Sequence, residues 1–135
     1  MNHAVSGQCA CGAIRIASAK APIAMLNCHC TDCQISSGAP FASGIVVMAE
    51  DLEISGAPST YDVRGSNGMV TRSFCGTCGT PLLTQGEANP QFISIRFPVL
   101  DDKASFKPMV DIYTGSAQPW VCLDEAIPHF PGSPG

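Results

Sequence analysis

Residues 74–82 read Phe-Cys-Gly-Thr-Cys-Gly-Thr-Pro-Leu and place Cys75 and Cys78 three positions apart. Two thiolates at this spacing can reach one metal ion around a tight turn, which is typical of a zinc knuckle. Gly76 and Gly79 suit such a turn, because glycine readily adopts a positive φ. The alternative is a thioredoxin-like redox pair, but the strand-helix-strand context of that motif is missing. The segment therefore predicts half of a metal site.

A second cysteine pair lies near the N-terminus, in Cys9-Ala10-Cys11-Gly12. Side chains two positions apart in an extended chain point to the same side, so this pair can also bind one ion. Together with Cys75 and Cys78 it supplies four thiolates, the ligand set of a closed structural zinc site. The alternative joins Cys9 and Cys11 to the cluster at residues 28–33 and leaves Cys75 and Cys78 free. We prefer the first partition because it uses both pairs and leaves no thiol out.

The cluster at residues 28–33 reads Cys-His-Cys-Thr-Asp-Cys. Its three thiolates, Cys28, Cys30 and Cys33, can bind one zinc ion and leave the fourth position open, as in catalytic zinc sites. Two alternatives are a second closed structural site and a redox-active or metal-free cluster. His29 is the least convenient fourth ligand, because in an extended segment its side chain points away from those of its neighbours. The candidate fourth ligands are His29, Asp32, Cys122, His3 and His129.

Composition limits the class of protein. The 135 residues (14.1 kDa) predict a single domain over 1–135, with a frayed tail from about 128 to 135 where three prolines occur. The net charge of −4, with only 7 lysines and arginines, argues against nucleic acid as a partner. The sequence shows neither a signal peptide nor the roughly 20 apolar residues of a membrane helix. We therefore expect a cytoplasmic protein with reduced thiols and no membrane partner.

Short segments of alternating polarity predict an all-β fold of small antiparallel sheets, and no helical periodicity of any length is present. We expect Phe92, Phe97 and Trp120 in the core, and Cys122 as a small buried hydrophobe. His3 and His129, near the termini, are expected to be solvated. The expected strands cover residues 13–17, 23–27, 41–48, 52–54, 61–63, 69–74, 92–97 and 110–113.

The three cysteine clusters, in this order, resemble the glutathione-dependent formaldehyde-activating enzyme family, which also includes centromere protein V. The resemblance runs from about residue 5 to 130 and includes Ser-Gly-Ala-Pro-Phe at residues 37–41. It implies a β-tent fold, in which small antiparallel sheets fold over one another around a structural zinc. It also implies that the structural zinc lies on Cys9, Cys11, Cys75 and Cys78, and a second zinc on Cys28, Cys30 and Cys33. One departure is Gln34, since the position after the third cysteine is often basic in the family.

The resemblance further implies condensation of glutathione with formaldehyde to S-(hydroxymethyl)glutathione. We therefore expect a zinc-dependent carbon–sulfur lyase acting on small thiol adducts, with a small thiol such as glutathione and a small carbonyl as partners. Its catalytic residues would be Cys28, Cys30 and Cys33. The alternatives are a non-catalytic zinc-stabilised β module that binds a protein, and a thiol or metal sensor. Which arginine faces the site is decided by the fold, and the candidates are Arg15, Arg64, Arg72 and Arg96.

The reaction also needs a proton donor for the carbonyl oxygen. His29, Asp32 and Ser37 are the nearest such side chains in the sequence. Backbone N–H groups around Gly38 are the alternative, as an oxyanion site.

Overall fold

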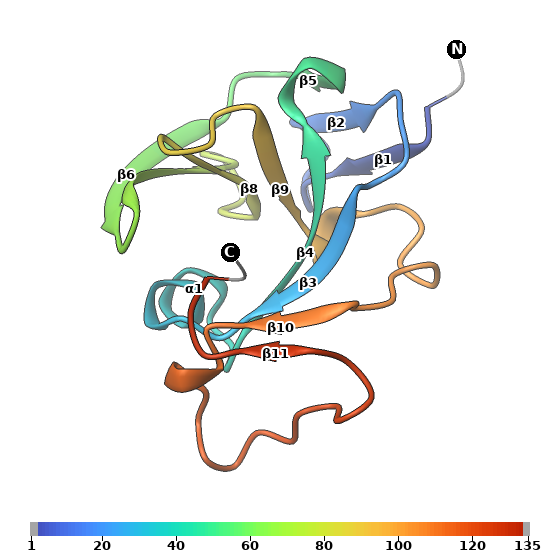
Figure 1. Ribbon diagram of the computed structural model, residues 1–135. Helices are drawn as coiled ribbons and strands as arrows, with labels where there is room; N and C mark the ends of the chain where they lie inside the picture. The colour runs from blue at the N-terminus through green and yellow to red at the C-terminus, as the bar shows by residue number, and fades with distance from the viewer. Residues whose placement is uncertain (1–2, 134–135) are drawn as a thin grey trace.

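A computed structural model describes residues 3–133 as two β-sheets with one short α-helix (Figure 1). The smaller sheet is antiparallel and has the order β1 (Val5–Gln8), β2 (Arg15–Ser18), β5 (Leu52–Ser55). The larger sheet has eight strands, in the order β11 (His129–Phe130), β10 (Val110–Ile112), β3 (Ala24–Cys28), β4 (Ala42–Met48), β9 (Phe92–Arg96), β8 (Pro81–Gly86), β7 (Gly68–Phe74), β6 (Ser59–Gly65). The helix is α1 (Thr31–Ser37), and the 3₁₀ turns are η1 (Ala49–Asp51), η2 (Phe97–Val99) and η3 (Thr114–Ser116).

The core lies on one face of the larger sheet. Ile45 and Val47 on β4 pair with Ile95 and Ile93 on β9, and all four side chains are buried. Strand side chains alternate between faces, so this apolar face is the one that the alternating pattern predicts. The smaller sheet contributes to the same cluster, which comprises Cys9, Ile14, Ile16, Ile45, Val47, Cys75, Leu82, Leu83, Ile93, Ile95, Val99 and Leu100.

The opposite face of the larger sheet carries a row of polar side chains. Arg72 on β7 pairs with Thr84 on β8, Thr84 pairs with Ser94 on β9, and Ser94 pairs with Val46 on β4. All four line one cavity. Because they alternate with core residues such as Ile93 and Ile95, the same strands that build the core also present this row to the site.

The larger sheet curls so that its two ends approach each other. The turn between β6 and β7 lies within hydrogen-bonding reach of the residue after β10, since the hydroxyls of Ser66 and Tyr113 are 3.0 Å apart. β3 pairs in parallel with β10, with Cys28 opposite Ile112. Since parallel strands end at the same edge, Cys30 and Tyr113 follow these two strands into the same region.

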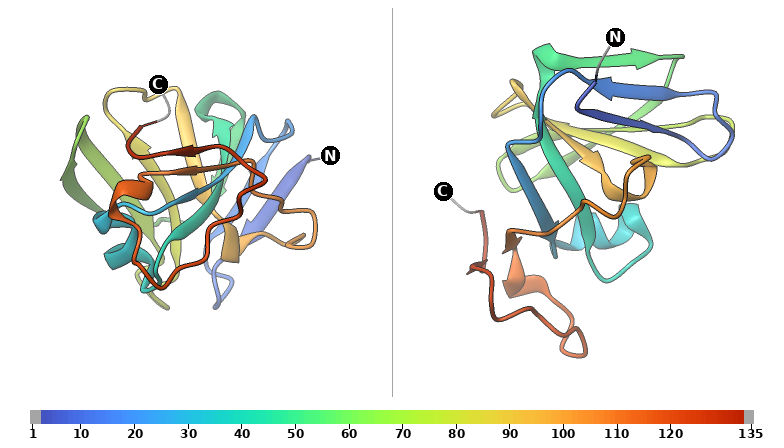
Figure 2. Two further views of the ribbon diagram at one scale, coloured as in Figure 1. Left: turned by 60° about the horizontal axis from the view of Figure 1, so that its bottom comes forward. Right: turned by 90° about the vertical axis from the view of Figure 1, so that its right-hand side faces the viewer.

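The predicted all-β class with small antiparallel sheets is confirmed, and the pairing departs from antiparallel at one edge. β10 pairs in parallel with both β3 and β11. Within the tail that begins at residue 128, His129 and Phe130 form the short strand β11 after a long excursion of the chain (Figure 2). Residues 134–135 of that tail lie outside the described residues.

The eight expected strands all occur, with shifted ends, whereas β1, β8 and β11 were not predicted. The sequence shows no helical periodicity, yet α1 occupies residues 31–37. None of its residues is fully buried, so no apolar face recurs at helical spacing. Phe97 packs against the core, but Trp120 is 70% exposed and Phe92 37% exposed. Cys122 is exposed, not buried. Within residues 3–133, no helix is long and apolar enough to cross a membrane.

Candidate metal centres

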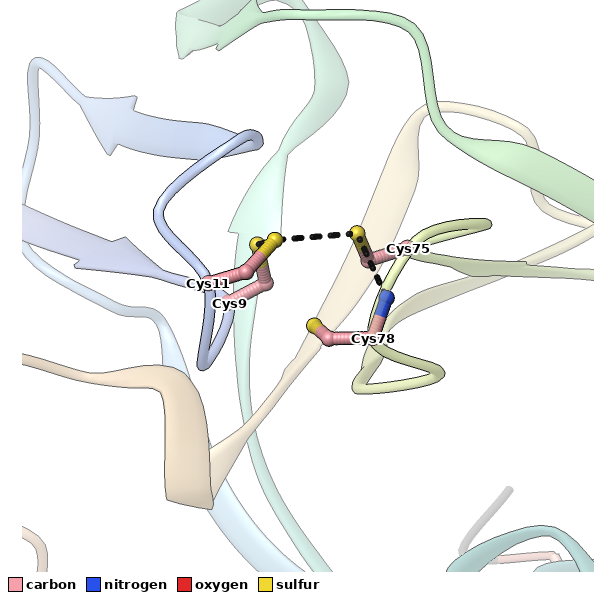
Figure 3. A group of neighbouring side chains, drawn as sticks. All are labelled: Cys9, Cys11, Cys75 and Cys78. Carbon is pink, nitrogen blue, oxygen red and sulfur yellow. Dashed lines mark hydrogen bonds between the residues drawn. The ribbon is translucent and has the colours of Figure 1, made fainter.

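Four cysteines from two distant turns converge between the sheets. Cys9 and Cys11 follow β1, whereas Cys75 and Cys78 follow β7, and the four sulfur atoms lie within 4.8 Å of one another (Figure 3). The Sγ atoms of Cys9 and Cys11 are 3.6 Å apart, and those of Cys11 and Cys75 are 3.7 Å apart. Four ligands at Zn–S bonds of about 2.3 Å would place tetrahedral sulfurs about 3.8 Å apart, so the group fits a zinc ion.

The local sequence explains the knuckle. Gly79 has φ +78°, a conformation that side chains rarely adopt. Gly76 does not have the expected positive φ; a Cβ there would lie 2.6 Å from Ser59 Oγ, so a larger residue would displace that hydroxyl. The backbone N–H of Cys78 donates to Cys75 Sγ at 3.5 Å. Hydrogen bonds from the hydroxyl and the backbone of Thr80 lower the pKa of Cys78 to about 5, which favours the thiolate that a metal requires.

The second group comprises the sulfur atoms of Cys28, Cys30 and Cys33, also within 4.8 Å of one another. Cys28 ends β3, Cys30 is the N-cap of α1, and Cys33 lies in its first turn. Cys30 Sγ accepts a hydrogen bond from the Cys33 N–H at 3.3 Å. Contacts with Cys28 and Cys33, and then the nearby Arg72 charge, hold the pKa of Cys30 well below its usual range. Three soft donors of this kind also fit zinc.

None of the expected fourth ligands joins the second group among residues 3–133. His29 points away from it, as predicted: its ring is buried against Phe41, and its Nε2 lies 2.9 Å from Asp111 Oδ1. His129 Nε2 lies 3.5 Å from the other oxygen of the same carboxylate. Asp111 lies on β10. Through these two contacts it holds both His29, just before α1, and His129, on β11, against that strand.

The second group faces a cavity of about 570 Å³. Cys30 and Cys33 line it together with Asp32, Arg72 and Tyr113. The remaining wall comes from the start of α1, from the β6–β7 and β8–β9 turns and from strands of the larger sheet: Thr31, Val46, Gly65, Ser66, Asn67, Met69, Val70, Thr84, Gly86, Ala88, Asn89, Phe92, Ser94 and Ile112. The structure therefore separates a four-cysteine group at the core from a three-cysteine group at a cavity, and no group mixes cysteines of the two sets within the described residues.

The structure removes three proton-donor candidates: the backbone N–H groups around Gly38, the Ser37 hydroxyl and His29. The Gly38 N–H already bonds the Gln34 carbonyl as the helix cap, and the Ala39 N–H bonds Ser37 Oγ, so neither is available as an oxyanion donor. The Ser37 hydroxyl donates to backbone carbonyls. His29 is occupied by Asp111 and is absent from the cavity wall. Of the three side chains nearest in sequence, only Asp32 lines the cavity.

Gln34 does not face the cavity. Its side-chain amide donates to the carbonyls of His29 at 2.8 Å and Ser116 at 3.0 Å, and its oxygen accepts from Gln118. The residue that departs from the family pattern therefore fastens the C-terminal loop to α1. Positive charge near the cysteines comes instead from Arg72 and Arg96, which are remote in sequence.

Tyr113 was missed as a site residue and expected only as the end of a strand. It has φ +56° and ψ +37°, a left-handed conformation that is uncommon for a bulky side chain. Its N–H bonds the Gly132 carbonyl, and its hydroxyl lies at Ser66 Oγ. Strained residues of this kind cluster at functional sites. No local sequence signal identifies Tyr113 as a site residue, because its partners Ser66 and Gly132 are remote along the chain.

Comparisons with known proteins support the fold and identify the family. A crystal structure of a Rhodobacter sphaeroides protein aligns with a TM-score of 0.60 and 18% sequence identity, covering 92% of this chain and 98% of that chain, which supports the fold alone. No curated protein matches significantly. The family model for the glutathione-dependent formaldehyde-activating enzyme matches residues 4–116, a range that holds both cysteine groups. The chain therefore belongs to the glutathione-dependent formaldehyde-activating enzyme family.

Proposed function

We propose that this protein is a zinc-dependent carbon–sulfur lyase that joins a small thiol, such as glutathione, to a small carbonyl such as formaldehyde, and reverses that reaction. The observation that carries the proposal is the three-cysteine group, which has no fourth protein donor within the described residues and opens onto a cavity. A closed four-ligand set lies elsewhere in the same fold, so the open set is not needed to hold the sheets together. None of the eight cysteines forms a disulfide, which is compatible with the reducing environment of the cytoplasm.

The metal and the protein have separate tasks in this proposal. A zinc ion on Cys28, Cys30 and Cys33 would take the substrate sulfur as fourth ligand and lower the pKa of that thiol from its usual value of about 8.5. The cavity admits both substrates and orients the sulfur toward the carbonyl carbon. The thiol proton passes to solvent when the sulfur becomes a thiolate. One carbon–sulfur bond then forms, the carbonyl π electrons move to oxygen, and that oxygen takes a proton from the protein to give a hydroxymethyl thioether.

Tyr113 supplies that proton in our proposal. Tyr113 lines the cavity, and its hydroxyl lies 3.0 Å from the exposed Ser66 Oγ, through which a proton from solvent can return to the tyrosine. A tyrosine hydroxyl is neutral near pH 7 and can donate a hydrogen bond to a developing oxyanion.

Tyr113→Phe is expected to lower kcat about 100-fold, the usual contribution of one positioned acid. Thiol affinity is expected to stay within about twofold, because the ring and the three cysteines remain. Steady-state kinetics with glutathione and formaldehyde, combined with thiol titration, separates the two effects. Thr60→Val, which removes an exposed hydroxyl on β6 outside this cavity, serves as the control. An unchanged kcat in Tyr113→Phe would exclude the tyrosine as proton donor.

Cobalt substitution tests the function itself. The cobalt-loaded protein is expected to show a stronger sulfur-to-metal charge-transfer band when glutathione or 2-mercaptoethanol is added, because a fourth sulfur joins the second group. Cys30→Ala should lose this response, whereas Cys122→Ala should keep it. If no thiol changes the band and the wild-type spectrum already shows two four-ligand sites, the protein is a zinc-stabilised module and the lyase proposal fails.

A further inference from the structure

Two arginines near the three-cysteine group each have one guanidinium nitrogen without a hydrogen-bond partner among residues 3–133. Arg96 is 6% exposed, and its Nη2 donates to Ser36 Oγ at 2.7 Å, but its Nη1 is buried without a partner among residues 3–133. The Nη1 of Arg72 is likewise buried without a partner there. Buried guanidinium nitrogens are almost always hydrogen-bonded, so these two open nitrogens call for an acceptor.

The described part of the chain offers neither arginine a carboxylate, since its ion pairs involve only Lys20, His29 and His129. Both arginines line one cavity of about 220 Å³ with Ser36 and Tyr61. Arg72 and Thr84 also line the larger cavity that contains Cys30 and Cys33. The two cavities therefore meet at the Arg72 side chain.

The cysteine thiolates do not neutralise all the positive charge of Arg72 and Arg96. Arg72 lies close enough to Cys30, and Arg96 to Cys33, for each guanidinium to stabilise the neighbouring thiolate. Three thiolates around a divalent ion carry one net negative charge, however, and the two guanidinium groups exceed it by one positive charge. Burial and the neighbouring Arg72 charge both lower the pKa of Arg96, so the two guanidinium groups repel each other. One further anion bound between the two arginines would balance the excess positive charge and weaken their repulsion.

We propose that Arg72 and Arg96 form a carboxylate receptor and that the thiol substrate carries a carboxylate that binds there. A carboxylate has two acceptor oxygens, one for each open Nη1, and pairs well with guanidinium donors. The thiol end then lies in the larger cavity at Cys30 and Cys33, and the carboxylate lies beyond Arg72. The assignment to a substrate rests on the proposed function, whereas the receptor itself depends only on the arginines.

Three small ligands test the two parts separately in the metal-loaded protein. 3-Mercaptopropionate carries both a thiol and a carboxylate, 3-mercapto-1-propanol lacks the carboxylate, and 3-(methylthio)propionate lacks the free thiol. Isothermal titration calorimetry gives the affinity of each, and the cobalt charge-transfer band reports whether a thiol reaches the metal. In the wild-type protein we expect 3-mercaptopropionate to bind at least about tenfold more tightly than the alcohol, since a hydrogen bond to a charged group is typically worth that much.

Arg72→Gln is expected to weaken binding of both acids about 10- to 100-fold more than binding of 3-mercapto-1-propanol, which has no carboxylate to lose. Arg72→Lys, which keeps the charge without the planar fork, should restore part of the acid affinity. Arg15→Gln is the matched control, because it removes the same charge from an exposed position on the smaller sheet.

Equal wild-type affinity for 3-mercaptopropionate and the alcohol would overturn the receptor, and that comparison needs no variant. An acid preference that survives Arg72→Gln unchanged would overturn it too. If both acids bind in an Arg72-dependent way while no thiol alters the cobalt band, the receptor is supported and the lyase proposal fails. If the thiols alter the band without any acid preference, the lyase proposal is supported and the receptor fails.

Discussion

Cys75→Ala is expected to yield insoluble or unfolded protein. Cys75 is 1% exposed within the core cluster, and its sulfur lies 3.7 Å from that of Cys11, which comes from the other sheet. A structural zinc ion contributes roughly 10 kcal/mol to folding in small modules. That is comparable to the whole stability of a domain, about 5–15 kcal/mol, so losing the ion leaves little to hold the two turns together. Soluble yield, circular dichroism and zinc content measure the outcome.

The chain provides a matched control for this substitution. Cys122 is exposed and belongs to neither cysteine group, so Cys122→Ala should fold and bind metal as the wild-type protein does. A Cys75→Ala protein that folds normally and still binds two zinc ions would show that the four-cysteine group is not a structural zinc site.

Cys30→Ala is expected to fold, to bind one zinc ion fewer than wild type and to lose the adduct-forming activity. Cys30 contributes one of three donors, and two remaining cysteines hold zinc poorly. Its loss also removes the N-cap of α1, at a cost of about 1 kcal/mol, which the domain can tolerate. Elemental analysis gives the zinc stoichiometry, and an assay of S-(hydroxymethyl)glutathione formation gives the activity.

The comparison of the two variants decides which group has which role. If Cys30→Ala unfolds the chain and Cys75→Ala does not, the structural and catalytic assignments are reversed. If Cys30→Ala folds and remains fully active, the second group has no catalytic role. Cys122→Ala again controls for the loss of one thiol.

Local patterns predicted the parts of this protein whose geometry is set within a few residues. A Cys-x-Cys segment and a Cys-x-x-Cys-Gly turn can each place two sulfurs on one ion, whatever the rest of the chain does. In the same way, Ile93 and Ile95 had to lie on the face opposite Ser94 and Arg96, because side chains alternate along a strand. Helix α1 escaped prediction because it is seven residues long and buries no side chain fully.

By itself, the sequence determined the mostly-β class, the three cysteine clusters and, through them, the family resemblance. Tertiary structure alone decided which residues surround the second cluster. Arg72 and Arg96 reach it through strand register, and Tyr113 through the parallel pairing of β10 with β3. Asp111 meets His29 across 82 positions of sequence. Such contacts depend on how strands pair and how the sheet curls, and these are set by packing summed over the whole core, which no short motif encodes.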